Sequence, residues 1–343
     1  MNTLEHGFNF IMISLFILAV FANPPTSSHN SAQLVSPIQS PASVGSTTSV
    51  EELFQKRAYQ KVIERLAPQL VQLPRSQVIL LGNSYSGLRN HAAALKTFNS
   101  LAGKSSQDPE VLTLIGREHF LNGQNTEALN SLRAAMEQKT QFEAAYHWTA
   151  RVYEKLKNYY ELRILYQDMI EKFGERPQFV QQVCRFSTLE GLNDLAEKSC
   201  GRAIELQPRE AIAHVHLGTA FKQKGDLEKA EKYLRQAATS FPQSALAQIA
   251  YARHFEEKKN PIQAYEQYKK ATQADPMNLQ AWVGVGQAAV EVQKYPEALD
   301  AFRKACRISP QSVAHLRKAS SILRTAGASK VLPKFEDLID HCQ

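Results

Sequence analysis

Cysteine and the common metal-binding motifs are scarce in this sequence. The 343 residues include four cysteines, which excludes a small scaffold held together by many disulfides. Neither Cys-x-x-Cys nor His-Glu-x-x-His occurs, so the usual zinc motifs are missing. No stretch alternates between apolar and polar residues for long, which predicts that no sheet forms.

Charge of one sign is not concentrated anywhere either. There are 40 Lys and Arg against 33 Asp and Glu, a net charge of +7, without a cluster or a basic tail. Nucleic-acid-binding chains usually carry a basic patch, so we expect no nucleic-acid partner. A mild preference for acidic partners or anionic surfaces stays open. The 43% of hydrophobic residues is enough to bury a core.

Residues 1–22 differ from the rest of the chain. Phe8–Ala22 is an apolar run of 15 residues, shorter than the roughly 20 that a membrane-spanning helix needs. It has the length of the apolar region of a signal peptide, and small residues precede a cleavage point after Ala22. The preceding segment has no Lys or Arg, so an uncleaved N-terminal anchor is the alternative. Both readings predict export, either to the periplasm or as a secreted protein.

Residues 23–49 contain no Lys, Arg, Asp or Glu and are rich in Ser, Thr and Pro. Such a segment has too few apolar side chains to offset the entropy of ordering, so we expect a disordered linker. It is either a remnant left after cleavage or a spacer that separates the folded part from a membrane.

The remaining chain is organised by a repeat of 34 residues. Seven copies fill residues 75–312 without an insertion: 75–108, 109–142, 143–176, 177–210, 211–244, 245–278 and 279–312. Position 8 is always small, position 20 is Ala in all but one copy, and position 24 is usually large and apolar. Position 32 is Pro in the last four copies. Small residues allow two antiparallel helices to approach, and Pro ends the second helix.

These columns resemble the tetratricopeptide repeat family. The resemblance covers the seven copies and implies an all-α, right-handed superhelical solenoid of antiparallel helix hairpins. Residues 50–74 resemble a degenerate N-terminal repeat, and residues 313–343 are expected to form capping helices that close the last face. The family type that fits the predicted export is a bacterial exported protein.

Nothing in the repeats predicts catalysis. Residues 284–289 match a weak dinucleotide motif, but no strand precedes them and Gly286 is a position-8 residue. His214 and His216 point to different faces of one helix and cannot share a metal ion. The repeats and caps leave no room for a catalytic domain. We therefore expect no enzyme, no cofactor and no metal.

Position 9 of the repeat suggests a binding surface. The resemblance implies that positions 2, 5, 9, 12 and 13 face a concave groove. Position 9 holds Arg117, Arg151, Arg185 and Arg253, with Phe120, His147 and Trp148 expected beside the first three. Guanidinium groups there could hold an acidic peptide or a C-terminal carboxylate. The alternative is that each arginine pairs internally, for instance with Glu118 or Glu154.

Cys184 and Cys200 occupy positions 8 and 24 of one repeat, where the two helices should face each other. An oxidising compartment would permit a disulfide between them. The alternative is a pair of buried free thiols. Cys306 and Cys342 are a second candidate pair.

We expect a non-enzymatic protein–protein interaction scaffold of the cell envelope that binds an extended peptide or a partner helix in the groove. The alternatives are a structural subunit of an envelope assembly that uses its outer faces, and an accessory repeat protein of a partner enzyme. The sequence leaves the oligomeric state and the partner open.

Overall fold

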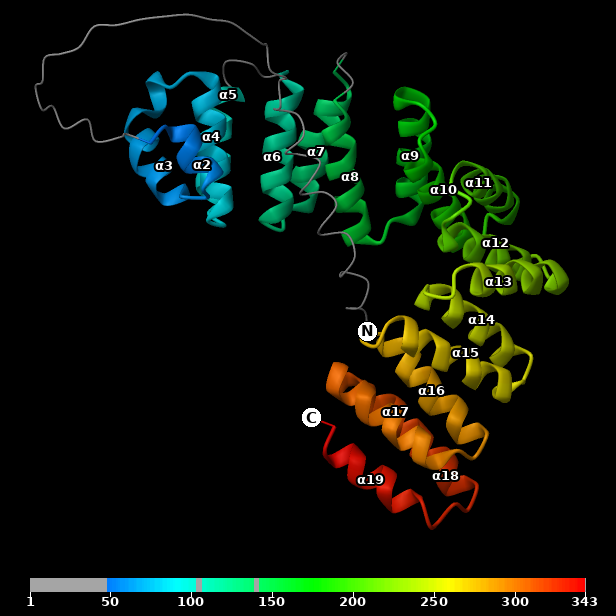
Figure 1. Ribbon diagram of the computed structural model, residues 1–343. Coiled ribbons are helices and arrows are strands. Elements are labelled where there is room, and N and C mark those ends of the chain that lie inside the picture. Colours follow the sequence, from blue (N-terminus) through cyan, green and yellow to red (C-terminus); the bar gives the residue numbers. More distant parts are fainter. Residues whose placement is uncertain (1–47, 103–106, 139–141, 343) are drawn as a thin grey trace, which may run out of the picture. The chain divides into compact units, whose positions relative to one another are not determined.

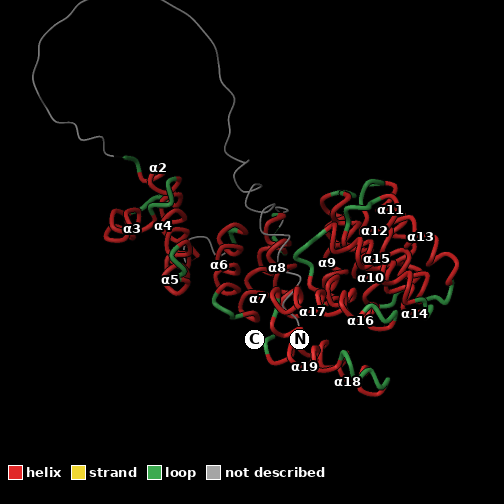
Figure 2. The backbone as a smooth tube through the Cα atoms, turned by 60° about the horizontal axis from the view of Figure 1, so that its bottom comes forward, coloured by secondary structure: helices red, strands yellow, loops and turns green. Residues whose placement is uncertain are grey.

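Helices form every regular element that the computed structural model describes, namely in residues 48–102, 107–138 and 142–342 (Figures 1 and 2). The predicted all-α solenoid of helix hairpins, without a sheet, is confirmed for these residues. The predictions for residues 1–22 and for nearly all of the linker lie outside the described residues. At the end of that linker the Ser49 hydroxyl accepts a hydrogen bond of 3.1 Å from the backbone of Glu52 and caps the first helix.

Each hairpin consists of a first and a second helix. The first helices are α4 (Arg75–Gly87), α6 (Pro109–Leu121), α8 (Glu143–Leu156), α10 (Pro177–Glu190), α12 (Ala211–Gln223), α14 (Ala245–Glu257) and α16 (Leu279–Glu291). The second helices are α5 (His91–Ala102), α7 (Asn125–Met136), α9 (Tyr159–Phe173), α11 (Asn193–Leu206), α13 (Leu227–Ser240), α15 (Pro261–Ala274) and α17 (Tyr295–Ile308). Starts of both kinds of helix recur at the same interval along the chain.

Close approach inside each hairpin depends on small residues. A side chain at Gly116 would place its Cβ 2.6 Å from Leu132 Cγ on the second helix, and one at Gly286 would lie 2.8 Å from the Phe302 ring. Atoms cannot pack at such distances, so glycine permits these helices to touch. The repeat that has Leu162 in place of Ala buries this side chain completely, together with Tyr146 and Met169.

The turns between first and second helices adopt the left-handed backbone conformation. Gly123, Gly191 and Gly225 do so with φ of 82°, 73° and 82°. In the α14–α15 turn the residue is Lys259, with φ of 53°. A side chain in this conformation costs on the order of 1 kcal/mol, so the turns without glycine carry some strain.

Successive hairpins stack so that their first helices share one side. Contacts join α6 to α8, α10 to α12, α12 to α14, and α14 to α16, and continue to α18 (Val313–Thr325). On the other side each second helix packs on the first helix of the following hairpin. We call the surface formed by α6, α8, α10, α12, α14, α16 and α18 the first-helix face.

Shorter helices close both ends of the stack. At the N-terminal end, α2 (Val50–Gln55), α3 (Tyr59–Leu66) and the 3₁₀ helix η2 (Ala67–Gln72) bury Val62 and Leu66 against Leu81. At the C-terminal end, η3 (Pro310–Ser312) leads into α18, and α19 (Leu332–Asp340) places Phe335 with its ring centroid 6.3 Å from that of Phe302.

Two disulfides cross-link the helices. Cys184 of α10 is joined to Cys200 of α11 with a Cα–Cα separation of 4.7 Å, inside the α10–α11 hairpin. Cys306 of α17 is joined to Cys342, which follows α19, with a Cα–Cα separation of 5.3 Å. Within the part of the chain that is described, no helix combines the length and apolar character needed to cross a bilayer.

Candidate functional site

The first-helix face carries a compact group of aromatic and cationic side chains. Arg151 on α8 places Cζ 4.5 Å from the ring centroid of Trp148 and 5.7 Å from that of Phe120 on α6. The two ring centroids are 6.1 Å apart. Lys155, one helical turn after Arg151, places Nζ 5.1 Å from the Phe120 centroid. We call Phe120, Trp148, Arg151 and Lys155 the aromatic–arginine cluster.

The Arg151 guanidinium contacts the rings of Trp148 and Phe120. Burial lowers the pKa of Arg151, and the charge of Glu154 partly opposes this shift. Among the described residues the guanidinium makes no ion pair and no hydrogen bond. Contacts between a cation and an aromatic ring use the flat face of the guanidinium, which leaves its N–H groups able to donate to a ligand.

Arg117 adopts the internally paired arrangement. Its Nε donates to Glu118 Oε1 at 2.8 Å, and a terminal nitrogen donates to Asn83 Oδ1 at 2.7 Å. The Glu118 carboxylate is fully buried and also accepts a hydrogen bond from the Ser86 hydroxyl, with His91 Nδ1 at 2.8 Å. Arg117 therefore neutralises a buried carboxylate, and the structure favours the alternative reading for this residue.

The other predicted residues lie in different surroundings. Arg185 on α10 is partly buried with Cζ 5.2 Å from the Phe186 centroid, and Arg253 on α14 is exposed and donates to Gln280 Oε1 at 3.2 Å. His147 lies 3.1 Å from Glu143 Oε1 and outside the aromatic–arginine cluster. Burial lowers the pKa of His216 to about 4, and the charge of Arg185 acts in the same direction. The structure thus brings together Phe120, Trp148 and Arg151 but not the whole row of arginines.

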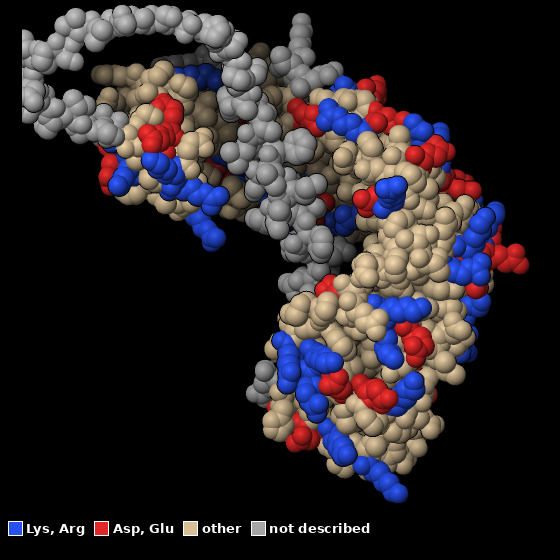
Figure 3. Space-filling model, viewed as in Figure 1, with Lys and Arg blue, Asp and Glu red and all other residues tan. Residues whose placement is uncertain are grey.

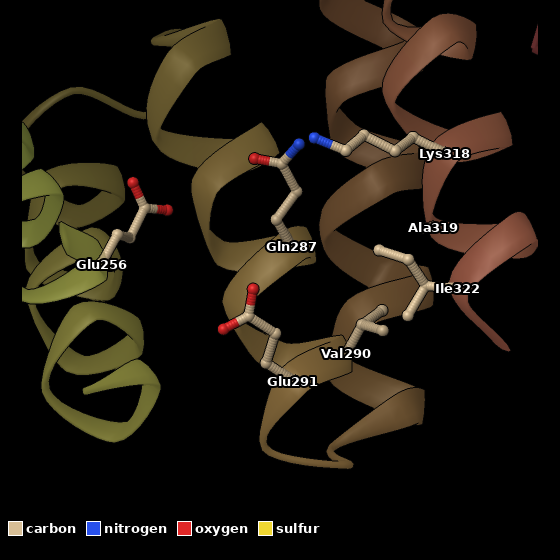
Figure 4. Close-up of a pocket in the computed structure, with 7 residues that line it drawn as sticks. All are labelled: Glu256, Gln287, Val290, Glu291, Lys318, Ala319 and Ile322. Carbon is tan, nitrogen blue, oxygen red and sulfur yellow. The ribbon is translucent and has the colours of Figure 1, made fainter. Parts of the chain in front are cut away.

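A pocket between α14, α16 and α18 was not predicted from the sequence. Its volume is about 270 Å³, and it is lined by Glu256, Gln287, Val290, Glu291, Lys318 and Ile322 (Figure 4). Burial raises the pKa of Glu256; the Tyr268 hydroxyl opposes this shift and the charge of Glu291 adds to it. Glu256 and Glu291 hold positions 12 and 13 of their repeats. These positions are among those implied to face the groove, so the sequence could have indicated that both glutamates lie on this surface.

A second hollow lies on the opposite side, over α15, α16 and α17. It has a volume of about 490 Å³, and its walls include Tyr265, Trp282 and Val285. Lys304 Nζ lies 4.3 Å from the Trp282 ring, while the indole N–H donates to the carbonyl of Pro276 at 2.8 Å. The hydrogen bond to Pro276 and the contact with Lys304 hold the Trp282 side chain in place.

Other chemistry is little represented. Among the described residues no three or more His, Cys, Asp or Glu side chains are grouped so that they could hold a metal ion. On the visible face of the molecule acidic and basic side chains lie near one another in several places, with a broad area of uncharged residues between them (Figure 3). Both observations direct attention to small local sites on the first-helix face.

Comparison with known proteins matches part of the repeat region to a known family. The tetratricopeptide repeat family model matches residues 190–245 and 250–313. No curated protein matches the sequence. A solved tetratricopeptide repeat protein from Parabacteroides merdae is similar in fold, with a TM-score of 0.53 and 14% identity over 74% of this chain and 94% of its own.

Two further solved structures are similar to a lesser degree. YrrB, described as a tetratricopeptide repeat protein with an unusual peptide-binding site, has 19% identity and a TM-score of 0.41 over 54% of this chain and 95% of its own. The Cut9–Hcn1 hetero-tetramer of the APC/C has 15% identity and a TM-score of 0.42 over 70% of this chain and 48% of that chain.

The hairpin fold and the repeat match define the class: a helical repeat solenoid. Within it, residues 190–245 and 250–313 match the tetratricopeptide repeat model, and the solved protein with a similar fold has the same kind of repeat.

Proposed function

We propose that this chain is a non-enzymatic protein–protein interaction scaffold that binds an extended peptide or a partner helix on the first-helix face. The observation that carries the proposal is the aromatic–arginine cluster, in which a partly buried guanidinium lies against two rings and has no carboxylate partner among the described residues. Aromatic side chains with one arginine are typical of the residues that contribute most to protein interfaces.

The cluster would select a partner by both shape and charge. Trp148 and Phe120 offer flat apolar surface to a partner side chain. The N–H groups of Arg151 can form paired hydrogen bonds with a carboxylate, and Lys155 adds a second positive charge next to it. The fitting partner is an acidic segment or a C-terminal carboxylate. Arg117 is left out of this recognition because its charge already faces the buried Glu118 carboxylate and it also donates to Asn83.

We also propose that the protein acts outside the cytoplasm, as a part of the cell envelope. The apolar run in residues 1–22 fits a signal peptide or an anchor. Disulfides persist in oxidising compartments, so the pairs Cys184–Cys200 and Cys306–Cys342 support export.

Charge reversal at the cluster tests the binding function. We would capture partners from envelope extract with the wild-type chain, with Arg151→Glu and with Arg209→Glu, and compare the bound proteins by quantitative mass spectrometry. Arg209 is an exposed arginine between α11 and α12, so its reversal is a control for charge alone. Partners lost with Arg151→Glu and kept with Arg209→Glu support the proposal, provided that the circular dichroism of the variants is unchanged.

Partners that remain bound to both variants would contradict the use of the first-helix face. That result would favour the structural subunit, or the accessory protein of a partner enzyme, docking through the opposite side. Substitutions in the hollow lined by Tyr265, Trp282 and Val285 would then test whether partners bind on that side.

A further inference from the structure

The pocket between α14, α16 and α18 is lined by two glutamates and one lysine, so its lining has an excess of negative charge. Glu256 of α14 and Glu291 of α16 turn their carboxylates toward the space between these helices (Figure 4). Among the described residues neither carboxylate has an ion pair. Neighbouring glutamates are different: Glu257 accepts from Lys222 at 2.8 Å, and Glu231 accepts from Lys258 at 2.7 Å.

Glu256 and Glu291 are both exposed to solvent, and their like charges repel each other across the pocket. Partial burial raises the pKa of Glu256, and the nearby Glu291 charge raises it as well, so the site disfavours two carboxylates. The hydrogen bond from the Tyr268 hydroxyl on α15 and the charge of Arg253 on α14 oppose this shift. A cation placed between the two helices would interact with both carboxylates at once.

The rest of the lining suits a long side chain. Val290 and Ile322 form an apolar wall, and Ile322 is 44% exposed although it is a large hydrophobic residue. The volume of about 270 Å³ has room for one side chain and not for a drug-sized ligand. Lysine and arginine combine an aliphatic stem with a terminal cation, and they bury the stem on apolar surface.

We propose that this pocket binds a lysine or arginine side chain of the partner peptide, with its stem on Val290 and Ile322 and its cation between Glu256 and Glu291. The inference deepens the proposed function because the pocket belongs to the same first-helix face as the aromatic–arginine cluster. The partner would therefore be a segment with an acidic part and a basic residue. Lys318 lies beside the Gln287 amide, on the other side of the pocket from Glu256 (Figure 4), and leaves the lining net negative.

A small probe tests the pocket without knowledge of the partner. We would titrate Nα-acetyl-lysine methylamide into the full chain and record methyl NMR signals of Val290 and Ile322. Nα-acetyl-norleucine methylamide, which lacks the charge, is the matched control probe. The expected result is a saturable shift of both signals with the lysine probe and none with the norleucine probe.

Three variants give the chemical basis of the shift. Replacing both Glu256 and Glu291 with Gln should weaken lysine-probe binding by about tenfold or more, because two charge interactions are lost. Glu228→Gln, an exposed position on α13, should leave it unchanged, and Lys318→Met should strengthen it. Equal shifts with both probes, or unchanged affinity in the Glu256→Gln/Glu291→Gln chain, would overturn the proposal.

Calcium chloride is the last arm of the titration. If calcium shifts the Val290 and Ile322 signals and the lysine probe does not, the pocket is a metal site and the proposal is overturned. Failure here is distinct from failure of the proposed function, because Arg151→Glu tests partner capture at a different cluster. Loss of capture with Arg151→Glu, together with no lysine-probe binding, would refute the pocket alone.

Discussion

Gly286 on α16 provides the sharpest test of how the hairpins hold together. An added Cβ would lie 2.8 Å from Phe302 Cζ and 2.9 Å from two further ring atoms. The Phe302 ring cannot turn away easily, because it is fully buried and packs on Phe335 at a centroid distance of 6.3 Å. We therefore expect Gly286→Ala to separate α16 from α17 and to lower the free energy of unfolding.

The magnitude follows from a comparison with Gly201 on α11. No atom lies within 4 Å of an added Cβ at Gly201, so Gly201→Ala should raise the free energy of unfolding by about 1 kcal/mol through helix propensity. At Gly286 the same gain is offset by overpacking that costs about 1–3 kcal/mol. The net loss at Gly286 is about 0–2 kcal/mol, and the two variants should differ by about 1–3 kcal/mol.

Urea unfolding followed by circular dichroism measures both variants. Trp282 lies on α16, so its fluorescence reports whether the region around Gly286 unfolds together with the rest, as repeat proteins do not always unfold in one step. Equal increases in stability for Gly286→Ala and Gly201→Ala would refute the argument that position 8 must be small.

Four other outcomes are expected. Lys259→Gly should raise the free energy of unfolding by about 0.5–1 kcal/mol, measured in urea, because φ of 53° suits glycine; Gly225→Ala is the opposite control and should lower it. Thiol titration of the denatured, unreduced protein should find no free thiol, and four would contradict both disulfides. His216 has a pKa of about 4 in the folded chain, below its usual 6.5, so stability should be complete above about pH 6.5 and should fall between pH 6.5 and 4. His216→Gln should flatten that part of the curve, and an unchanged pH profile would argue against burial as the cause. A reporter that is active only outside the cytoplasm should be active when fused to residues 1–49, and silence would contradict export.

The fold could be predicted because packing demands recur at fixed positions. A small residue at position 8 and an apolar one at position 24 are needed in every hairpin, as Gly116 with Leu132 and Gly286 with Phe302 demonstrate. Because these packing requirements recur in every hairpin, the 34-residue period can be seen in the sequence. The class of fold was accessible from these columns alone.

The candidate site could be predicted only in part. Arg151, a position-9 residue, lies near Trp148 and Phe120 because the neighbouring first helices α6 and α8 bring these side chains together. The repeat position alone does not distinguish Arg151 from Arg117. The two arginines differ because Arg117 is followed in the chain by the buried Glu118, which also contacts His91 of α5. The acidic pocket was missed because its two glutamates occupy different positions of successive repeats.

The Cys306–Cys342 disulfide also decides how the chain would respond to mechanical force. Tension applied between the two ends of the protein passes through the sulfur–sulfur bond and bypasses the segment between the cysteines, which spans a sequence separation of 36. At about 3.4 Å per extended residue this loop withholds on the order of 120 Å of contour length. A pulled solenoid would lengthen by opening the hairpins that no disulfide closes, while α18 and α19 stay free of load.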